Sequence, residues 1–516
     1  MAGPSHRADM RQKLAFLLLS LFTFSALAVE KPKLIVAIAV DQFRYEYLLR
    51  FRSEYKQGLD RLLTRGAVFS NAYYDHFPTV TAIGHSTYLS GATPALSGIV
   101  ANDWFDREAG KTVTSVSDDS VKMLGGDGDG GASPRRLLVS TVGDEMKMSN
   151  GGRSRAIGMS LKDRSAILPS GHMADGAFWF DEKSGRFVSS TYYFPALPAW
   201  VSVFNEEHPV DRYKGARWAG GQLPEETGAN LYRAVYGSPF GNELLEALAE
   251  RALVSEKLGQ RDATDLIAIS FSSNDAIGHA VGPDSPEVHD VSVRTDQVLG
   301  KLFQFLDSKI GMDNVLVIFT ADHGVAPVPE VNQARKMPGG RMTPRIVHDT
   351  VQAELTKKYG AGDWISSPSE HTLYLNLDLI RQKKLDRAEV NAAAAAVART
   401  IPHVFRVYTR EQLLNGYAME DEVGRRVANG FYERRGADVY VLLESYWMFS
   451  AHGTTHGSTF NYDAHVPVIF MGPGIKTGRF DERIAVNDIA PTLATLLGIE
   501  TPSGSVGRAL AEIISP

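Results

Sequence analysis

The chain has 516 residues, enough for one large core or two ordinary ones, and its 44% apolar and 22% charged content is ordinary for a globular protein. The formal net charge of −6 argues against a nucleic-acid-binding protein, which usually has a basic face. Attraction of an anionic substrate would therefore need local cations. The absence of cysteine excludes disulfides, zinc–thiolate sites and cysteine nucleophiles.

Residues 1–28 have the pattern of a secretory signal peptide. Basic residues precede the apolar run LAFLLLSLFTFSALA, which ends in the small-x-small motif Ala26-Leu27-Ala28. An N-terminal membrane anchor is the alternative, but the run is shorter than the roughly 20 residues of a spanning helix. We therefore expect a periplasmic or secreted protein whose mature chain, residues 29–516, is not held in a membrane.

Two kinds of segment alternate along the mature chain. Unbroken apolar runs of strand length occupy residues 34–40, 266–271, 315–319 and 466–471. Amphipathic stretches occupy residues 45–65, 242–258, 286–309, 345–359 and 387–399. Unbroken apolar strands are typical of a mainly parallel sheet that is buried on both faces. The alternation predicts a doubly wound α/β fold.

Two regions interrupt this alternation, and we expect both to be insertions in a single catalytic domain spanning residues 29–516. Residues 165–235 are rich in aromatic residues, glycine and proline, which favours a hairpin-bearing insertion. Residues 330–450 mix helical and strand patterns, which favours a cap or second subdomain. The segment GGDGDGG at residues 125–131 lacks the spacing and terminal glutamate of a calcium loop, so a solvated loop is predicted.

Candidate metal ligands follow the first two apolar runs. Asp41 comes directly after residues 34–40, where the carboxyl end of a parallel strand opens into a crevice, although an aspartate there is often a cap or turn residue. The motif DAIGH follows residues 266–271. If the chain turns helically there, Asp275 and His279 lie on one helix face and can share an ion; an exposed pair is the alternative.

The third run ends in TADHG, where Asp322 and His323 are adjacent. Neighbouring side chains on a strand point to opposite faces, so both can reach one ion only if the backbone leaves the extended form. We expect Gly324 to permit that departure. Near the C-terminus, His456 competes with two other histidines, His452 and His465, and spacing alone does not choose among the three.

Thr81 precedes AIGHSTYLSG, a segment typical of a helix start. The hydroxyl would project into the crevice, and the free N–H groups of the first helical turn would face an anion bound there. Simple N-capping is the alternative. Carboxylate and imidazole ligands at strand ends, with one hydroxyl among them, indicate a two-metal site with a threonine nucleophile.

The motifs VDQ, PTVTAIGH, GIVANDWFD, SNDAIGH, TADHG and THGS occur in this order, and together they resemble the alkaline phosphatase superfamily from residue 33 to the C-terminus. The resemblance implies two zinc ions per chain. It implies one ion on Asp41, Thr81, Asp322 and His323, and the other on Asp275, His279 and His456. It also implies that the Asn102 amide donates a hydrogen bond to a phosphoryl oxygen.

The segment SLKDRSAILPSGH resembles the phosphate-irrepressible alkaline phosphatases, in which a lysine and an arginine two residues apart clasp the phosphate. Here they are Lys162 and Arg164. A phosphate monoester dianion has oxygens for both cations, whereas a diester carries an organic group there. The resemblance therefore implies a phosphomonoesterase that acts on small-molecule phosphate monoesters through a phosphothreonine at Thr81.

Two other functions are compatible with the sequence. A phosphodiesterase or nucleotide pyrophosphatase could use the same scaffold, with an apolar pocket in place of the two cations. An exported metal- or phosphate-binding protein without turnover is the alternative from a different class, although a binding site needs no threonine among its ligands. A sulfatase is disfavoured because no Cys-x-Pro-x-Arg or Ser-x-Pro-x-Arg element occupies the nucleophile position. We expect a monomer.

Overall fold

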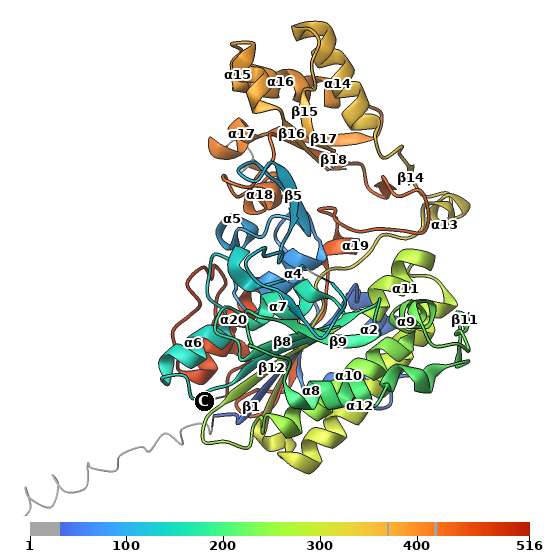
Figure 1. Ribbon diagram of the computed structural model, residues 1–516, viewed down its shortest axis with the longest axis vertical. Helices are drawn as coiled ribbons and strands as arrows, with labels where there is room; N and C mark the ends of the chain where they lie inside the picture. Colours follow the sequence, from blue (N-terminus) through green and yellow to red (C-terminus); the bar gives the residue numbers. More distant parts are fainter. Residues whose placement is uncertain (1–30, 129, 369–370, 417–419, 516) are drawn as a thin grey trace, which may run out of the picture.

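The computed structural model describes residues 31–128, 130–368, 371–416 and 420–515, so the expected signal peptide lies outside the described residues. At its centre is a ten-stranded sheet with the order β21-β2-β20-β13-β1-β12-β7-β8-β9-β6 (Figure 1). In chain order the strands are β1 (Leu34–Val40), β2 (Ala67–Phe69), β6 (Met123–Leu124), β7 (Ala156–Ser160), β8 (Gly176–Asp181), β9 (Arg186–Ser190), β12 (Asp265–Phe271), β13 (Val315–Thr320), β20 (Val468–Met471) and β21 (Gly478–Phe480).

Five neighbouring strands form the parallel centre of this sheet: β13, β1, β12, β7 and β8. All seven residues of β1 are fully buried, as the run LIVAIAV predicts for a strand covered on both faces. The last predicted strand differs in direction, because β20 runs antiparallel to both β13 and β2. An apolar run reports burial on both faces but not strand direction, so the sequence could not show this.

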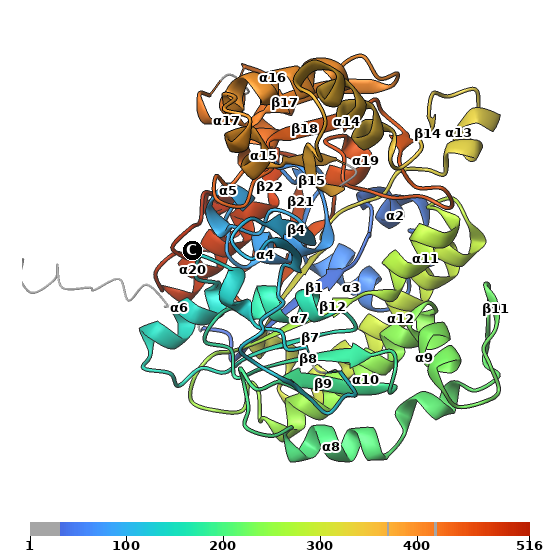
Figure 2. The same cartoon turned by 45° about the horizontal axis from the view of Figure 1, so that its top comes forward.

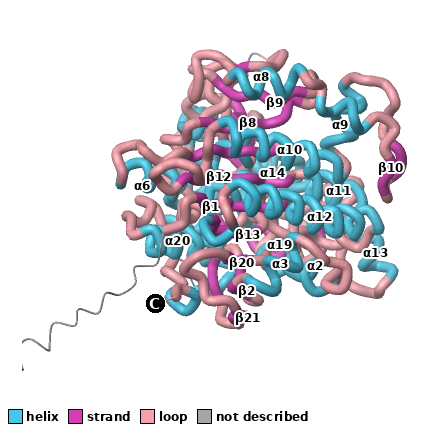
Figure 3. The backbone as a smooth tube through the Cα atoms, turned by 90° about the horizontal axis from the view of Figure 1, so that it is seen from below, coloured by secondary structure: helices cyan, strands magenta, loops and turns pink. Residues whose placement is uncertain are grey.

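Helices cover both faces of the sheet. Figure 3 shows α10 and α12 on one side of the strands and α6 and α20 on the other. Four helices cover the first face: α3 (Gly58–Arg65), α8 (Ala199–Glu206), α10 (Pro239–Ser255) and α12 (Pro286–Lys309). The second face is covered by α4 (Thr81–Tyr88), α6 (Val142–Ser149), α7 (Asp163–Ser170) and α20 (Ile489–Leu497). The predicted α/β fold with a mainly parallel, doubly wound sheet is confirmed.

The amphipathic stretch 45–65 forms two helices, α2 (Tyr45–Arg50) and α3, rather than one. The buried carboxylate of Asp296, on α12, accepts hydrogen bonds from the backbone N–H groups of Lys56, Gln57 and Leu59 at 2.7–2.9 Å. These bonds satisfy the free donors at the start of α3. Asp296, more than 200 residues away in the sequence, thus determines where α3 begins, and the local hydrophobic period does not reveal this.

A second sheet stands above the main body and lies within the predicted insertion 330–450 (Figure 1). Its antiparallel order is β15-β16-β18-β17. The strands are β15 (Ile365–Pro368), β16 (Thr372–Leu375), β17 (Val404–Thr409) and β18 (Val439–Leu443). The helices of this segment are α13 (Pro329–Ala334), α14 (Ile346–Tyr359), α15 (Leu377–Gln382), α16 (Arg387–Ala398), α17 (Arg410–Leu414) and α18 (Glu422–Asn429).

The region 165–235 is arranged differently, because its hairpin β8–β9 continues the central sheet: β8 pairs parallel to β7, and β9 pairs antiparallel to β8. Helix α9 (Ala229–Tyr236) and a small pair, β10 (Arg217–Trp218) with β11 (Gly221–Gln222), follow it. Across the part of the chain that the structure describes, no helix combines the length and apolar character needed to cross a bilayer.

Three further pairs of short strands connect the layers. They are β3 (Ala72–Tyr73) with β22 (Ile484–Ala485), β4 (Asp103–Asp106) with β5 (Lys111–Thr114), and β14 (Gly340–Arg341) with β19 (Trp447–Met448). In Figures 1 and 2 the β4–β5 hairpin lies between α4 and the second sheet. The hairpin thus lies between the main body and the inserted segment, next to α4.

Candidate functional site

The predicted ligands come together at one edge of the central sheet. Asp41 directly follows β1, Asp322 lies two residues beyond β13, and Asp275 lies in α11 (Ser273–Val281), which begins just after β12. Lys162 follows β7 in the same way. Because β13, β1, β12 and β7 are parallel neighbours, their carboxyl ends share one edge, and so do the groups that follow them.

Thr81 is the first residue of α4 and is 1% exposed. Its Oγ1 lies 3.3 Å from His323 Nε2. The N-cap position is Val80, whose side chain cannot accept a hydrogen bond, and Thr81 itself is not the cap. The hydroxyl therefore faces the ligand cluster rather than the helix end, which removes the N-capping alternative.

One group of ligands is fully buried: Asp41, Asp322 and His323 have no exposed surface. His323 Nε2 lies 3.2 Å from Asp322 Oδ2 and 3.6 Å from Asp41 Oδ1. Neither of these two carboxylate oxygens has a hydrogen-bond partner among the described residues. A buried oxygen without a partner is costly unless a cation satisfies it, so this group fits a metal ion.

The second group is more open. His279 Nε2 lies 3.2 Å and His456 Nε2 lies 3.7 Å from Asp275 Oδ1, and the His279 side chain is 38% exposed. These three residues can hold an ion, and Asp275 can also contribute to a set with Asp41 and His323. The two groups therefore meet at Asp275. An open position beside one group is typical of metal sites at which a substrate binds.

The histidine tautomers support coordination through Nε2. The Nδ1 atoms of His279, His323 and His456 lie 2.8–2.9 Å from the carbonyl oxygens of Thr454, Gly324 and Thr79, respectively. A carbonyl oxygen only accepts, so each Nδ1 carries the proton and each Nε2 is left with a lone pair. This arrangement, with Nδ1–H fixed by a neighbouring acceptor, is typical of metal-binding histidines.

The other two C-terminal histidines lie elsewhere. His465 Nε2 bonds to the Ser70 carbonyl oxygen at 2.9 Å, and its ring stacks between Tyr45 and Tyr73, each at 4.6 Å. His452 is exposed. Of the three histidines that sequence spacing left open, only His456 is near Asp275.

Lys162 lies between the two groups. Its Nζ donates to Asp41 Oδ2 and to Asp275 Oδ2, both at 2.6 Å. Burial would lower the pKa of Lys162, but the two carboxylates raise it, so the side chain is a cation. Arg164, in the first turn of α7, has its nearest carboxylate at 3.8 Å, and its Nε has no hydrogen-bond partner among the described residues.

Asn102 is held by the helix that carries Thr81. Its Oδ1 accepts a hydrogen bond from the backbone N–H of Ala82 at 2.8 Å. With its oxygen fixed on α4, the amide group of Asn102 is oriented away from that N–H, and none of the described residues accepts from it. The geometry leaves this amide available to a bound oxygen.

Burial and crowding shift the pKa values of the carboxylates in opposite directions. Burial, with Asp322 close by, raises the pKa of Asp41. Burial alone would also raise the pKa of Asp275, but Lys162 and His279 hold it well below its usual value. Burial would likewise raise the pKa of Asp322, but the neighbouring His323 lowers it below its usual value. Three carboxylates with one lysine among them make a strongly negative centre, the environment that divalent cations neutralise.

Sequence reasoning missed two residues that organise this centre. The Gln42 backbone N–H donates to Asp322 Oδ1 at 3.0 Å, and its Nε2 donates to Asp275 Oδ1 at 2.7 Å. Gln42 has a φ of 64°, which a non-glycine residue seldom adopts. His85 connects the Thr81 carbonyl oxygen, at 2.9 Å from Nδ1, with Ser270 Oγ on β12, at 2.7 Å from Nε2. The sequence offered one indication of a role for Gln42 and His85, which is that they lie within the motifs VDQ and AIGH.

The chain leaves the extended form before Asp322, as expected, since β13 ends at Thr320. Gly324 is not among the residues with positive φ. A Cβ atom there would lie 2.2 Å from the Tyr462 carbonyl oxygen, and its N–H donates to the Asp463 carbonyl oxygen at 2.6 Å. Glycine is therefore needed for a close approach of two backbone segments, one of which follows His456.

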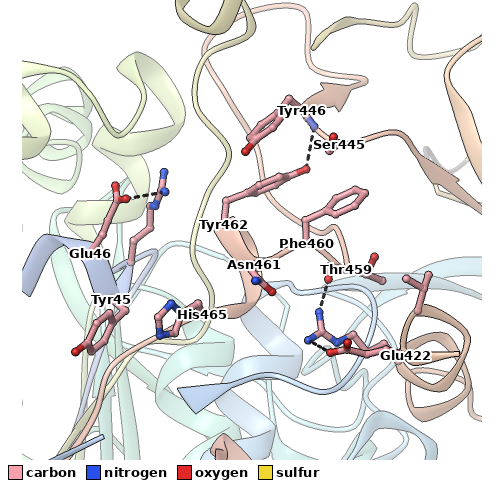
Figure 4. Close-up of a pocket in the computed structure, with 13 residues that line it drawn as sticks. Tyr45, Glu46, Glu422, Ser445, Tyr446, Thr459, Phe460, Asn461, Tyr462 and His465 are labelled. Atoms are coloured by element: carbon pink, nitrogen blue, oxygen red, sulfur yellow. Dashed lines mark hydrogen bonds and ion pairs between the residues drawn. The ribbon is translucent and has the colours of Figure 1, made fainter. Parts of the chain in front are cut away.

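A separate pocket of about 630 Å³ lies beside α2 and α19 (Asn461–Ala464) (Figure 4). Tyr45, Phe460 and Tyr462 line it, and the Tyr446 backbone N–H donates to the Tyr462 hydroxyl at 3.1 Å. None of the predicted site residues lines this pocket. The candidate catalytic centre is therefore the ligand cluster at the sheet edge and not this cavity.

Comparison with known proteins agrees with this geometry. The chain is 35% identical to alkaline phosphatase PafA of Elizabethkingia meningoseptica, over 94% of this chain and 95% of the relative. It is also 35% identical to alkaline phosphatase PhoV of Synechococcus elongatus, over 94% of each chain. The crystal structure of wild-type PafA superposes with a TM-score of 0.88 and 34% identity, and it covers 95% of this chain and 100% of that chain.

A family model matches residues 35–463 and is described as type I phosphodiesterase / nucleotide pyrophosphatase. This match spans every predicted site residue from Asp41 to His456. The chain therefore belongs to the type I phosphodiesterase/nucleotide pyrophosphatase family, within the alkaline phosphatase superfamily.

Proposed function

We propose that this protein is a phosphomonoesterase that hydrolyses small phosphate monoesters at a two-zinc centre through a covalent phosphothreonine at Thr81. The observation that carries the proposal is the position of the Thr81 hydroxyl, 3.3 Å from His323 Nε2 and beside two groups of ligands that share Asp275. A binding protein has no need of this hydroxyl. Similarity to relatives named alkaline phosphatase supports the same reaction class.

The first zinc ion would be held by Asp41, Thr81, Asp322 and His323. The second would be held by Asp275, His279 and His456. Mixed imidazole and carboxylate ligands suit zinc. When bound, such ions lower the pKa of a coordinated hydroxyl and neutralise negative charge on reacting oxygens.

The chain's own residues position the substrate. Thr81 Oγ1 attacks phosphorus in line, forms a P–O bond and expels the alcohol; water then cleaves the new P–O bond and releases inorganic phosphate. Phosphoryl transfer needs mainly positioning and charge stabilisation. Arg164, with its unpartnered Nε, and the free amide of Asn102 are suited to contact phosphoryl oxygens. Lys162 supplies a buried positive charge between the two ligand groups.

The nucleophile is tested by substitution. We expect Thr81→Ala to lower kcat/KM for p-nitrophenyl phosphate by at least about 10³-fold, because the group that forms the covalent bond is removed. Thr81→Ser, which keeps the hydroxyl, is the matched control and should retain more activity. Zinc content is measured for both variants. Near-wild-type turnover by metal-loaded Thr81→Ala would refute the assignment.

The choice between monoester and diester is tested at the two cations. We expect Lys162→Ala/Arg164→Ala to lower kcat/KM about 10²-fold more for a monoester than for a diester with the same leaving group, because only the monoester has the extra charged oxygen. Equal losses for the two esters would instead favour a phosphodiesterase, the activity named in the description of the matched family.

We further propose that residues 1–28 direct export and are removed, that residues 29–516 form the catalytic domain, and that the enzyme acts as a monomer in the periplasm or outside the cell. The inserted segments near 165–235 and 330–450 would shape access to the centre. N-terminal sequencing of the protein recovered from the periplasm of an expression host tests the first point, with Val29 as the expected first residue. Analytical ultracentrifugation measures the oligomeric state, with a monomer as the expected result.

A further inference from the structure

A cavity of about 420 Å³ is lined by residues of the main body and of the second sheet, and we call it the aromatic pocket. The β4–β5 hairpin, which lies between α4 and the second sheet in Figures 1 and 2, contributes Phe105 and Thr112 to the lining of this pocket. Six of its lining residues are Val80, Asn102 and Phe105 from the body, and His371, Tyr374 and Tyr440 from the second sheet and its flank.

The aromatic pocket adjoins the candidate catalytic centre, because Asn102 and Val80 line it. Val80 directly precedes Thr81, and Asn102 is hydrogen-bonded to the N–H that follows Thr81. Gly457, the neighbour of the candidate ligand His456, lies close to two of the lining residues. A Cβ atom at Gly457 would lie 3.7 Å from Val80 Cγ1 and 3.9 Å from His371 Nε2. A group attached to phosphorus at Thr81 therefore has this pocket beside it.

The lining favours a flat apolar group. The rings of Phe105 and Tyr374 meet edge to face at 5.9 Å, and the Tyr374 hydroxyl donates to the Arg435 carbonyl oxygen at 2.9 Å. The Tyr440 hydroxyl accepts from the Ala437 N–H at 3.2 Å. Arg435 and Ala437 do not line the pocket, so both hydroxyls bond to groups outside its lining, whereas both tyrosines are lining residues. Aromatic rings favour other rings at this distance.

Within the part of the chain that the structure describes, the one acidic residue that lines the cavity is Asp103, which disfavours an anionic leaving group and is compatible with a neutral one. Burial lowers the pKa of His371 to about 4, so the ring is uncharged near neutral pH. Its Nδ1 and Trp104 Nε1 are buried and have no hydrogen-bond partner among the described residues. These atoms can satisfy a polar substituent on a ring. Two tyrosines, a phenylalanine and a tryptophan around 420 Å³ have the composition of a small-molecule site.

We propose that the aromatic pocket binds the leaving group of the ester and makes the enzyme prefer aryl phosphates to alkyl phosphates. The inference rests on the proposed phosphomonoesterase function and adds the substrate class to it. The phosphoryl group contacts the body, whereas the organic group is held between the body and the second sheet. The second sheet thus contributes substrate selection rather than chemistry.

The test compares phenyl phosphate with a fluorinated alkyl phosphate whose alcohol has similar acidity, so that leaving-group chemistry is matched. We expect Phe105→Leu and Tyr374→Leu each to reduce kcat/KM for the aryl ester about tenfold more than for the alkyl ester. Thr372→Trp, which fills the pocket from β16, should reduce kcat/KM for the aryl ester, relative to the alkyl ester, by more than about tenfold. Inhibition by inorganic phosphate should change less than twofold, since phosphate carries no leaving group.

The matched control is Tyr359→Leu, an aromatic residue of the same inserted segment that packs on Trp364, at 5.6 Å, away from the pocket. It should leave the aryl-to-alkyl ratio unchanged. Equal losses for both esters in the pocket variants, or an unchanged ratio, overturn the inference while leaving phosphomonoesterase activity in place. Absence of turnover with both esters in the metal-loaded wild-type protein instead overturns the proposed function itself.

Discussion

Three buried carboxylates, Asp41, Asp275 and Asp322, lie at one edge of the sheet, and each is oriented by a contact that comes from outside its own motif. Gln42 bonds to two of them, one through its backbone and one through its side chain. The Gln42 amide packs on Gly278, where a Cβ atom would lie 1.8 Å from Oε1. Gln42 is therefore a positioning residue that couples the turn after β1 to the ligands of both groups.

We expect Gln42→Leu to weaken zinc binding by about 10- to 100-fold, because hydrogen bonds to a ligating carboxylate fix its orientation. The backbone bond to Asp322 remains, so the loss reports the side-chain amide alone. A competition titration with a chromogenic chelator measures the affinity.

The control for this substitution is Gln352→Leu. The Gln352 side chain is also held by hydrogen bonds: it accepts from the Trp364 N–H and donates to the Gly362 carbonyl oxygen and the Thr356 hydroxyl. It lies on α14, in the inserted segment. It should lower stability without changing zinc affinity. If the two variants bind zinc equally well, Gln42 has no positioning role.

For single residues, the sequence predicted which side chains follow the strand ends, but not which hydrogen bonds orient those side chains. The spacing of Asp275 and His279 and the adjacency of Asp322 and His323 were visible in the motifs. His85 was not, because its partners, the Thr81 carbonyl oxygen and Ser270, come from its own helix and from a strand 185 residues away. Contacts of this kind depend on tertiary structure, and local periodicity carries no information about them.

Among the elements, α4 carries the proposed nucleophile Thr81, and the position of this helix depends on a close contact with the turn after β13. A Cβ atom at Gly84 would lie 2.2 Å from the Asp322 carbonyl oxygen. Glycine therefore lets α4 approach the backbone of Asp322, a candidate metal ligand, and it does so without a positive φ.

We expect Gly84→Ala to lower the free energy of unfolding by about 1–3 kcal/mol, the usual cost of overpacking, and to lower kcat by moving Thr81 away from His323. Chemical denaturation and steady-state kinetics measure the two effects. Gly237→Ala is the control, since a Cβ atom there meets nothing closer than 3.4 Å. If Gly84→Ala and Gly237→Ala have the same unfolding free energy and kcat, the proposed close contact between α4 and the Asp322 backbone is wrong.

The packing of α10 against α12 gives the protein a pH dependence outside the site. Burial, together with Glu250, raises the pKa of Glu246 to about 8, although Lys301 opposes the shift. Glu246 Oε2 accepts from Lys301 Nζ at 2.6 Å, and its other oxygen has no hydrogen-bond partner among the described residues. The folded state therefore binds this proton more tightly than the unfolded state does.

Because the folded pKa lies above the ordinary value of 4.5, this stabilisation is present below pH 4.5 and is lost as pH rises towards 8. In the wild-type protein we expect the free energy of unfolding to fall by on the order of 1 kcal/mol across this pH range, and in Glu246→Gln we expect this fall to be absent. Urea unfolding at both ends of the range measures it. Glu354→Gln, at an exposed position on α14, is the control, and an unchanged pH slope in Glu246→Gln would reject the assignment.

Element boundaries show which patterns are locally encoded. The strand β1 and the helix α12 have the predicted bounds, since burial on both faces and a regular amphipathic period each leave a clear signal. The break between α2 and α3 left none, because Asp296 sets it from α12. The hairpin β8–β9 was predicted as part of an insertion, yet it extends the central sheet, a matter of strand pairing that composition does not determine.

The whole molecule brings ligands from residues 41 to 456 to one sheet edge, so the centre forms only when the fold is complete. Its carboxylates are buried, and the main positive charge among them is that of Lys162. A bound cation relieves this repulsion in the folded chain alone, because the unfolded chain has no assembled site. We therefore expect metal binding and folding to be coupled.

We expect a chelator to abolish phosphatase activity and to lower the melting temperature by about 5 °C or more, since each ion present at 100 times its Kd stabilises the folded state by about 2.7 kcal/mol. Differential scanning calorimetry measures the shift, and added zinc should restore both the melting temperature and turnover. The variant His279→Ala/His456→Ala keeps the buried group and removes the open one, so it should show a smaller shift. A melting temperature that is the same with and without chelator, in protein whose zinc content falls to zero, would show that the ions contribute nothing to the fold.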